Sequence, residues 1–402
     1  MGAEPAGDAL NRTKRIAIVV EAPPDQRDRA RLGAEACRQK GLEVTFYDVS
    51  GLTRPHVAFT APTTPAADVV RIERSDQLPA LRQAAAACDL VMLHVGFTGD
   101  LSRLRVYRAL AKAGTPVMVF AHNAYPGAAP TRPGAGRLVE LWRRLLALRV
   151  NPLRSLIARL PHGWLGIRPV DFIVLGGRRS AAGRRMYPCA ASTRKIWAHS
   201  NDYEFFRATA DTVPPRQAIA VFIDENMCFQ QDLRDLKIDD WITPDQYYPK
   251  LCRLFERIEA ATGLTVVIAA NPRAERDKRM GLFGNRRVEH GNTAALVARA
   301  SLVIAHRSTA VGYAVMAGLP VFLCSLDQLF RHWVNHRAYL AFTQALGRPL
   351  VMFDEPETVD LQGILDVDAV SQRQYREDYV KRSVSPDAPL WDLVLNAALR
   401  EC

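Results

Sequence analysis

The chain has 402 residues, of which 48% are hydrophobic and 24% are charged, and its formal net charge is +11. These values are typical of a globular protein long enough for two domains. No stretch approaches eighteen uninterrupted apolar residues, so no membrane-spanning helix is predicted. The seven cysteines are scattered and include no C-x-x-C pair, which argues against a structural zinc site and favours a reducing compartment.

The basic charge is concentrated in one segment. Residues 132–195 contain fourteen Arg and Lys against two acids, which gives +12 for the segment and leaves about −1 for the remainder. No interleaved aromatic residues or nucleic-acid-binding module accompany it, so we expect no nucleic-acid partner. Localised charge of this kind indicates one anionic surface or ligand.

Predicted strands and helices alternate through the first half of the chain. Residues 1–14 lack the apolar core of a secretory signal, so we expect a disordered lead-in to a cytoplasmic protein. The strands predicted next are 15–20, 44–49, 89–95, 116–121, 171–176 and 195–199, with helices at 27–40, 78–87 and 101–113. This rhythm is typical of a doubly wound parallel sheet and assigns 15–213 to one domain.

An amphipathic stretch at 137–160 interrupts the rhythm. Leucines alternate with arginines, and Pro152 divides the stretch into two helices. One interpretation is a peripheral contact with anionic lipid of the inner membrane leaflet. The other is an ordinary helix pair with one face toward the core and arginines in solvent.

Pro214 and Pro215 mark the domain boundary, and the alternation restarts behind them. Predicted strands lie at 218–223, 264–270, 286–288, 302–305, 321–324 and 350–353, with helices at 244–262, 293–299 and 308–317. We therefore expect a second Rossmann-like domain over 216–369 and a helical tail over 370–402.

Three strands of the second half end in polar groups. These groups are Asp224-Glu225-Asn226, Asn271-Pro272-Arg273 and His306-Arg307-Ser308-Thr309. Because the carboxyl ends of parallel strands meet at one edge, we expect them to face a single ligand. Arg273 suits a bidentate phosphate contact, and Asp224 or Glu225 suits ribose binding, base catalysis or metal binding.

The last of these strand ends opens a strand–turn–helix–strand unit over 300–324. Ser308 and Thr309 occupy the helix N-cap, where open N–H groups and the helix dipole favour an anion such as phosphate. His306 is a candidate to neutralise or protonate a leaving phosphate. The alternative is that Ser308 only caps its helix. Asn292 is expected to cap the short helix that begins at Thr293.

The second half contains the motif N-P-R, followed about thirty residues later by H-R-S-T-A and G-L-P-V. These motifs lie behind a proline hinge between two Rossmann-like halves. The combination resembles GT-B glycosyltransferases of bacterial capsule and lipopolysaccharide assembly. The resemblance covers mainly 218–325. It implies an α/β fold with two Rossmann-like, doubly wound domains facing across a cleft. It also implies a nucleotide-sugar co-substrate, no other cofactor and no metal, and a glycan or lipid-linked acceptor. Asn271, Arg273, His306, Arg307, Ser308, Thr309, Asn292 and Thr293 would then lie around the donor.

The chain departs from the family pattern at two positions. Asn271 stands where a histidine is frequent, and Tyr313 stands where many retaining members carry a glutamate. We therefore expect an inverting glycosyltransferase with one catalytic base. His94, Asp100 and His122 follow predicted strands of the first half and are the candidates. Alternatives are a nucleotide-sugar 2-epimerase, a CDP-alditol phosphotransferase and a non-catalytic polysaccharide-assembly protein.

Overall fold

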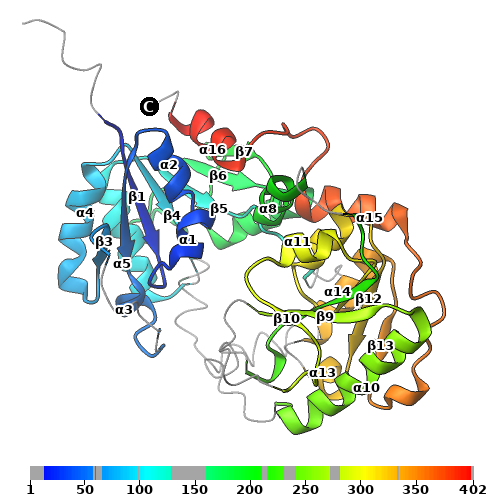
Figure 1. Cartoon of the computed structure of the whole chain (residues 1–402). Coiled ribbons are helices and arrows are strands. Elements are labelled where there is room, and N and C mark those ends of the chain that lie inside the picture. The colour runs from blue at the N-terminus through cyan, green and yellow to red at the C-terminus, as the bar shows by residue number, and fades with distance from the viewer. Residues whose placement is uncertain are drawn as a thin grey trace, which may run out of the picture.

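Two parallel sheets organise the chain, each with helices on both faces (Figure 1). The computed structural model describes residues 13–399 apart from 58, 60–65, 98, 128–156, 158–159, 211–214, 230–240, 272–280 and 333–334. The first sheet has the order β3-β2-β1-β4-β5-β6-β7 and the second β10-β9-β8-β11-β12-β13. Every pairing in both sheets is parallel, as the alternation of strands and helices predicts.

The first sheet is built from the N-terminal half of the chain. Its strands are β1 (Arg15–Val20), β2 (Glu43–Asp48), β3 (Val69–Arg71), β4 (Leu90–Leu93), β5 (Val117–Phe120), β6 (Phe172–Leu175) and β7 (Arg194–Trp197). The helical elements around it are α1 (Gln26–Arg31), α2 (Ala34–Gln39), α3 (Ser50–Thr53), η1 (Ser75–Gln77), α4 (Leu78–Ala86), α5 (Leu101–Ala113) and η2 (Arg178–Met186). The central strands β1, β4 and β5 are buried on both faces, which explains their uninterrupted apolar sequences.

The second sheet follows the same plan. Its strands are β8 (Ile219–Ile223), β9 (Thr265–Ala269), β10 (Val288–Glu289), β11 (Leu302–Ala305), β12 (Val321–Ser325) and β13 (Leu350–Met352). Its helical elements are η3 (Met227–Phe229), α10 (Pro244–Thr262), α11 (Thr293–Ala298), α12 (Val311–Met316), α13 (Asp327–Arg331), α14 (His336–Leu346), η5 (Pro356–Thr358), α15 (Ala369–Tyr375) and the π-helical turn η6 (Arg376–Val380). Helix α10 packs on one face, whereas α11, α12 and α14 pack on the other.

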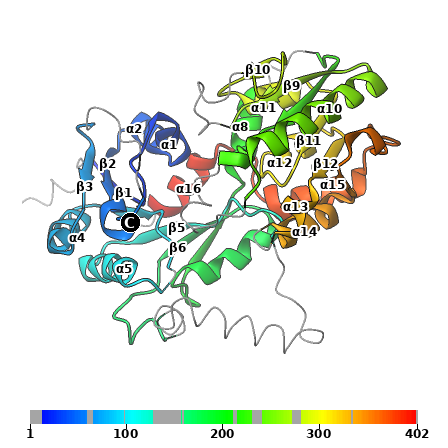
Figure 2. The same ribbon diagram turned by 90° about the horizontal axis from the view of Figure 1, so that it is seen from below.

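Two helices cross the boundary drawn from the sequence. Helix α8 (Asn201–Ala210) precedes the proline pair, yet its Tyr203 packs in the core of the second sheet. Helix α16 (Leu390–Leu399) ends the described chain, yet Trp391 and its neighbours pack in the core of the first sheet (Figure 1, red). Each sheet is therefore covered in part by one helix from the opposite side of the boundary at Pro214 and Pro215. The view from below shows α8 between the two sheets (Figure 2).

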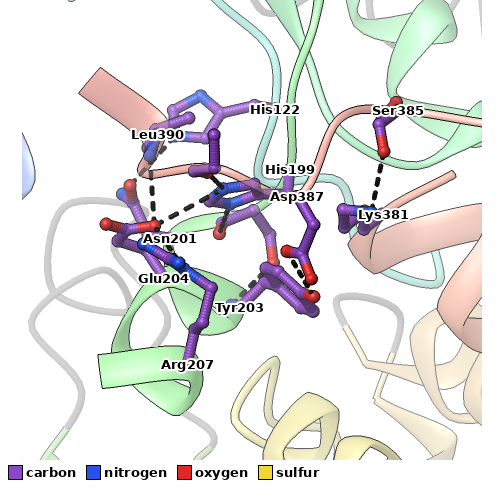
Figure 3. Close-up of polar contacts among 12 residues, drawn as sticks. His122, His199, Asn201, Tyr203, Glu204, Arg207, Lys381, Ser385, Asp387 and Leu390 are labelled. Carbon is purple, nitrogen blue, oxygen red and sulfur yellow. Dashed lines mark hydrogen bonds and ion pairs between the residues drawn. The ribbon is translucent and has the colours of Figure 1, made fainter. Parts of the chain in front are cut away.

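A buried polar cluster holds the crossing segment 381–389 against α8 (Figure 3). His199 is fully buried, and its Nε2 lies 3.1 Å from the carbonyl oxygen of Ala388 and 3.4 Å from Oε2 of Glu204. The same Glu204 oxygen accepts the Leu390 N–H at 3.1 Å. These bonds fix the place where the chain returns to the first sheet, so the junction between the sheets is held by polar contacts.

The basic amphipathic stretch 137–160 is described only at Ile157 and Leu160. Ile157 is buried in the core of the first sheet, and Leu160 packs against that core. This part of the stretch therefore faces the protein interior, as one of the two interpretations requires. The remaining residues of the stretch lie outside the described part of the chain.

Candidate active site

The polar strand ends of the second half lie on neighbouring strands. Asp224 follows β8, Asn271 follows β9 and His306 follows β11, and these strands are adjacent in the order β9-β8-β11. The predicted convergence at one sheet edge is therefore present for these three residues. Arg273 lies outside the described residues.

Asp224 holds two loops together at this sheet edge. Its Oδ1 accepts the N–H of Asn226 at 2.8 Å, and its Oδ2 accepts the N–H of Asn271 at 3.3 Å. The first bond holds a turn in which Asn226 adopts φ of +56°, a conformation that asparagine tolerates better than most residues. Because both carboxylate oxygens bind backbone, Asp224 joins the β8 and β9 loops and is placed as a structural residue.

Glu225 lies beside the turn that carries Arg307. Its Oε1 accepts the Arg307 backbone N–H at 2.7 Å. Burial raises the pKa of Glu225 to about 7, although the Arg307 charge opposes this shift. The Nε atom of Arg307 is buried and has no partner among the described residues. A buried carboxyl with a pKa raised toward neutrality beside an arginine is typical of a functional site.

His306 is a structural residue rather than the acid that we expected. The ring is fully buried, its Nδ1 donates to the Cys324 carbonyl oxygen at 2.6 Å, and its Nε2 accepts from the Tyr247 hydroxyl at 2.6 Å. We assign this tautomer because a carbonyl can only accept. Burial lowers the pKa of His306 to about 4, so the ring is neutral at pH 7. With both nitrogens occupied, the ring has no proton to give to a leaving group.

The turn after His306 also differs from the expectation. Helix α12 begins at Val311, so Ser308 and Thr309 lie in the turn before it. Ser308 Oγ accepts the Ala310 N–H at 3.2 Å, and the N–H groups of Val311 and Gly312 donate to the Ser308 and Thr309 carbonyls. The turn therefore uses these three amides internally, and they are not open to an anion. Arg307 remains its cationic group.

Asn292 and Thr293 lie at the start of α11, as predicted. The Asn292 side chain accepts the Ala295 N–H at 3.2 Å and caps the helix. Asp100 is a cap as well, because its carboxylate accepts the N–H groups of Ser102 and Arg103 at the start of α5. Both residues therefore have a structural role that accounts for their position.

His94 and His122 lie at the carboxyl edge of the first sheet, after the adjacent strands β4 and β5. His94 stacks on Phe120, with ring centroids 4.4 Å apart and an interplanar angle of 10°. Its Nε2 is buried and has no partner in the described chain. Burial, followed by His122 and Arg31, lowers the pKa of His94 to about 3. The ring is therefore neutral and carries an unused nitrogen.

His122 is more deeply buried, at 3% exposure. Its Nε2 lies 3.1 Å from Oδ1 of Asn201 at the start of α8, and its Nδ1 has no partner in the described chain. Burial also lowers the pKa of His122 to about 4. The residue next to Asn201, Asp202, lies close to Gly312 of α12. The N-terminus of α8 therefore connects the edges of the two sheets.

A pocket of about 270 Å³ opens beside His94. Its polar lining comes from His94, Glu21, Asp28 and Arg54, and the remaining walls are apolar. Glu21 follows β1 and forms an ion pair with Arg103, with Nε to Oε1 at 2.6 Å. Glu21 was not among the residues predicted from the sequence, although it follows a buried strand as the other candidates do. Arg54 comes from a loop and had no such signal.

No protein-family model and no curated protein sequence matches the chain. Solved structures do match it. The calicheamicin glycosyltransferase CalG4 aligns over 97% of this chain and 99% of its own, with a TM-score of 0.50 and 14% identity. A variant of the wall teichoic acid polymerase TagF aligns over 97% of this chain and 89% of its own, with a TM-score of 0.51 and 10% identity.

The chain has the GT-B fold. Both alignments span the two sheets, so the likeness extends beyond residues 218–325 into the first half of the chain. At 10–14% identity the likeness concerns the fold and not the chemistry. Among the described residues, no helix is long and apolar enough to cross a membrane. The same part of the chain contains no cluster of three or more His, Cys, Asp or Glu arranged to hold a metal ion.

Proposed function

We propose that the chain is a glycosyltransferase of surface polysaccharide synthesis. In this proposal a nucleotide sugar binds at the second sheet edge, and a glycan or lipid-linked acceptor binds at the first. The observation that carries the proposal is the neutral ring of His94, which lines a polar pocket at a sheet edge of the GT-B fold and whose Nε2 has no partner among the described residues. A general base must be unprotonated before the reaction, and the lowered pKa of His94 meets that requirement.

His94 is the best of the three predicted bases. Asp100 is used as a helix cap, and His122 does not line the pocket. In the proposed reaction, His94 Nε2 takes the proton of an acceptor hydroxyl while that oxygen bonds to the anomeric carbon. The bond from this carbon to the donor phosphate breaks, and the nucleoside diphosphate leaves with the electron pair. A single displacement of this kind inverts the anomeric configuration.

Arg307 is the proposed partner of the departing diphosphate. Its backbone N–H is held by Glu225, and the residue follows β11, whose neighbour β8 is followed by Asp224. Positive charge that is fixed before the reaction stabilises the negative charge that develops on the leaving group. Ser308, Thr309, Asn271, Asn292 and Thr293 lie along the same edge and complete the proposed donor site, together with Arg273.

Nucleotide binding tests this proposal directly. A thermal-shift screen of UDP, CDP, TDP and GDP should find at least one that stabilises the protein, by roughly 2.7 kcal/mol at a hundredfold excess over its Kd. Arg307→Gln should remove that stabilisation. Arg331→Gln, which changes an exposed arginine on α13, is the matched control. The proposal fails if none of the four nucleotides nor their common sugar conjugates binds saturably.

The wall teichoic acid polymerase TagF matches the fold as well as CalG4 does, which keeps a phosphotransferase reaction as the second candidate. The two reactions leave different products. Glycosyl transfer releases a nucleoside diphosphate, whereas phosphotransfer from a CDP-alditol releases a nucleoside monophosphate. Analysis of the released nucleotide with the donor that binds therefore decides between them.

A further inference from the structure

A groove of about 740 Å³ runs between helices α14 and α15, outside the site described above. The two helices lie side by side in the second half of the chain (Figure 2). They run antiparallel, because Gly347 after α14 lies against Ser371 near the start of α15. The volume is that of a site for a small organic ligand.

The groove is polarised along its length. Its basic end lies where α14 begins and η6 follows α15, and there Arg337 and Arg179 line it. Toward the other end the lining carries no charge. It consists of the apolar Leu340, Ala341, Ala345 and Val370 and of the uncharged polar Gln344, Ser371 and Gln374. Leu340 is 49% exposed and Val370 is 68% exposed. Large apolar side chains at the mouth of a groove are typical of a binding surface.

The basic end lies at the junction of the two sheets. Arg179 belongs to η2 of the first half, whereas Arg337 belongs to α14 of the second. The one carboxylate in the lining, Asp378, is already shared between Arg178 at 2.9 Å and Arg179 at 3.6 Å. The lining therefore retains an excess of positive charge.

This end also lies close to the end of β5 and to the residue that precedes α8. Gly176 packs against the carbonyl oxygens of both His122 and Val380, so η6 lies beside the end of β5. A head group bound by Arg337 and Arg179 would consequently lie near the N-terminus of α8. The apolar part of the same ligand would extend away from that junction, along α14 and α15.

We propose that this groove binds a lipid phosphate, with the phosphate between Arg337 and Arg179 and the hydrocarbon chain over Leu340 and Val370. The charge at one end and the apolar wall at the other match such an amphiphile. This inference rests on the proposed function, because it identifies the acceptor as a lipid-linked one. It places the lipid on the second half of the chain and not on the basic segment 132–195.

Binding of decyl phosphate to the full-length protein, measured by isothermal titration calorimetry below its micelle concentration, tests the proposal. We expect saturable binding at one site per chain, and binding of decanol and of inorganic phosphate weaker by about tenfold or more. Arg337→Gln and Leu340→Asp should each weaken decyl phosphate binding by about tenfold or more. The matched controls are Arg373→Gln, on α15 but outside the lining, and Leu365→Asp, 48% exposed and also outside it.

The proposal is overturned if decyl phosphate does not bind, or if the groove variants and their controls bind it equally well. It is also overturned if Leu340→Asp changes only the sedimentation of the protein, because the groove would then be a contact between two copies of the chain. Nucleotide thermal shifts recorded on the same variants keep the outcomes separate. Nucleotide binding without decyl phosphate binding contradicts the lipid site and leaves the proposed donor site intact.

Discussion

The imidazole of His306 and the hydroxyl of Tyr247 share a buried hydrogen bond of 2.6 Å. The partners are 59 positions apart in the sequence, and the bond ties the end of β11 to α10. The Cys324 carbonyl on β12 binds the other ring nitrogen. One neutral histidine therefore joins three elements of the second half, and its role is to fix the strand end from which Arg307 projects.

Acidification should destabilise the protein through its buried histidines. The pKa values of His306 and His122 are both about 4 in the folded chain, against an ordinary value of 6.5. Between pH 6.5 and pH 4 the unfolded chain therefore binds more protons at these two rings than the folded chain does. The contribution to stability is complete above pH 6.5, falls by about 1.4 kcal/mol per pH unit for each ring, and levels off below pH 4.

Urea unfolding at pH 7.5, 5.5 and 4.5 measures this effect. His122→Asn should reduce the slope of unfolding free energy against pH by the share of one ring. His56→Asn, at an exposed position, should leave the slope unchanged. Equal slopes for His122→Asn and the wild type between pH 6.5 and 4.5 would show that the ring of His122 is not buried neutral in the folded protein.

The packing of α16 against the first sheet should contribute several kcal/mol to the free energy of unfolding. Trp391 of α16 is 7% exposed, and its ring centroid lies 5.7 Å from that of Phe120. Trp391→Ala should lower the free energy of unfolding by about 3–5 kcal/mol, because it leaves a cavity in a packed core. Trp164, 80% exposed, is the matched control, and its replacement by Ala should change stability by no more than about 0.5 kcal/mol. Equal effects of the two substitutions would contradict the packing of α16.

Much of the architecture could be predicted from the sequence, because buried parallel strands are locally visible as short apolar runs. The same local signal placed Asp224, Asn271 and His306 at strand ends. It could not separate their roles, since those depend on distant partners such as Tyr247 for His306 and Phe120 for His94. The sequence also did not predict that α8 covers the second sheet and α16 the first, because an amphipathic helix does not specify which sheet it covers.

Nucleotide affinity should depend on the protonation of Glu225. The pKa of this residue is raised to about 7, so acidification from pH 8 to pH 6.5 removes negative charge beside Arg307. We expect the Kd of the bound nucleoside diphosphate to fall roughly fivefold over this range, as about 1 kcal/mol of charge coupling implies. Calorimetric titration across the range should give a flat profile for Glu225→Gln. Weaker binding at the lower pH would exclude this coupling.

If His94 is the catalytic base, its loss should slow transfer at saturating donor. We expect kcat of His94→Gln to fall by about 10²–10⁴-fold, with donor affinity unchanged and with His56→Gln as active as the wild type. A His94→Gln enzyme that retains the wild-type kcat would show that His94 is not the base.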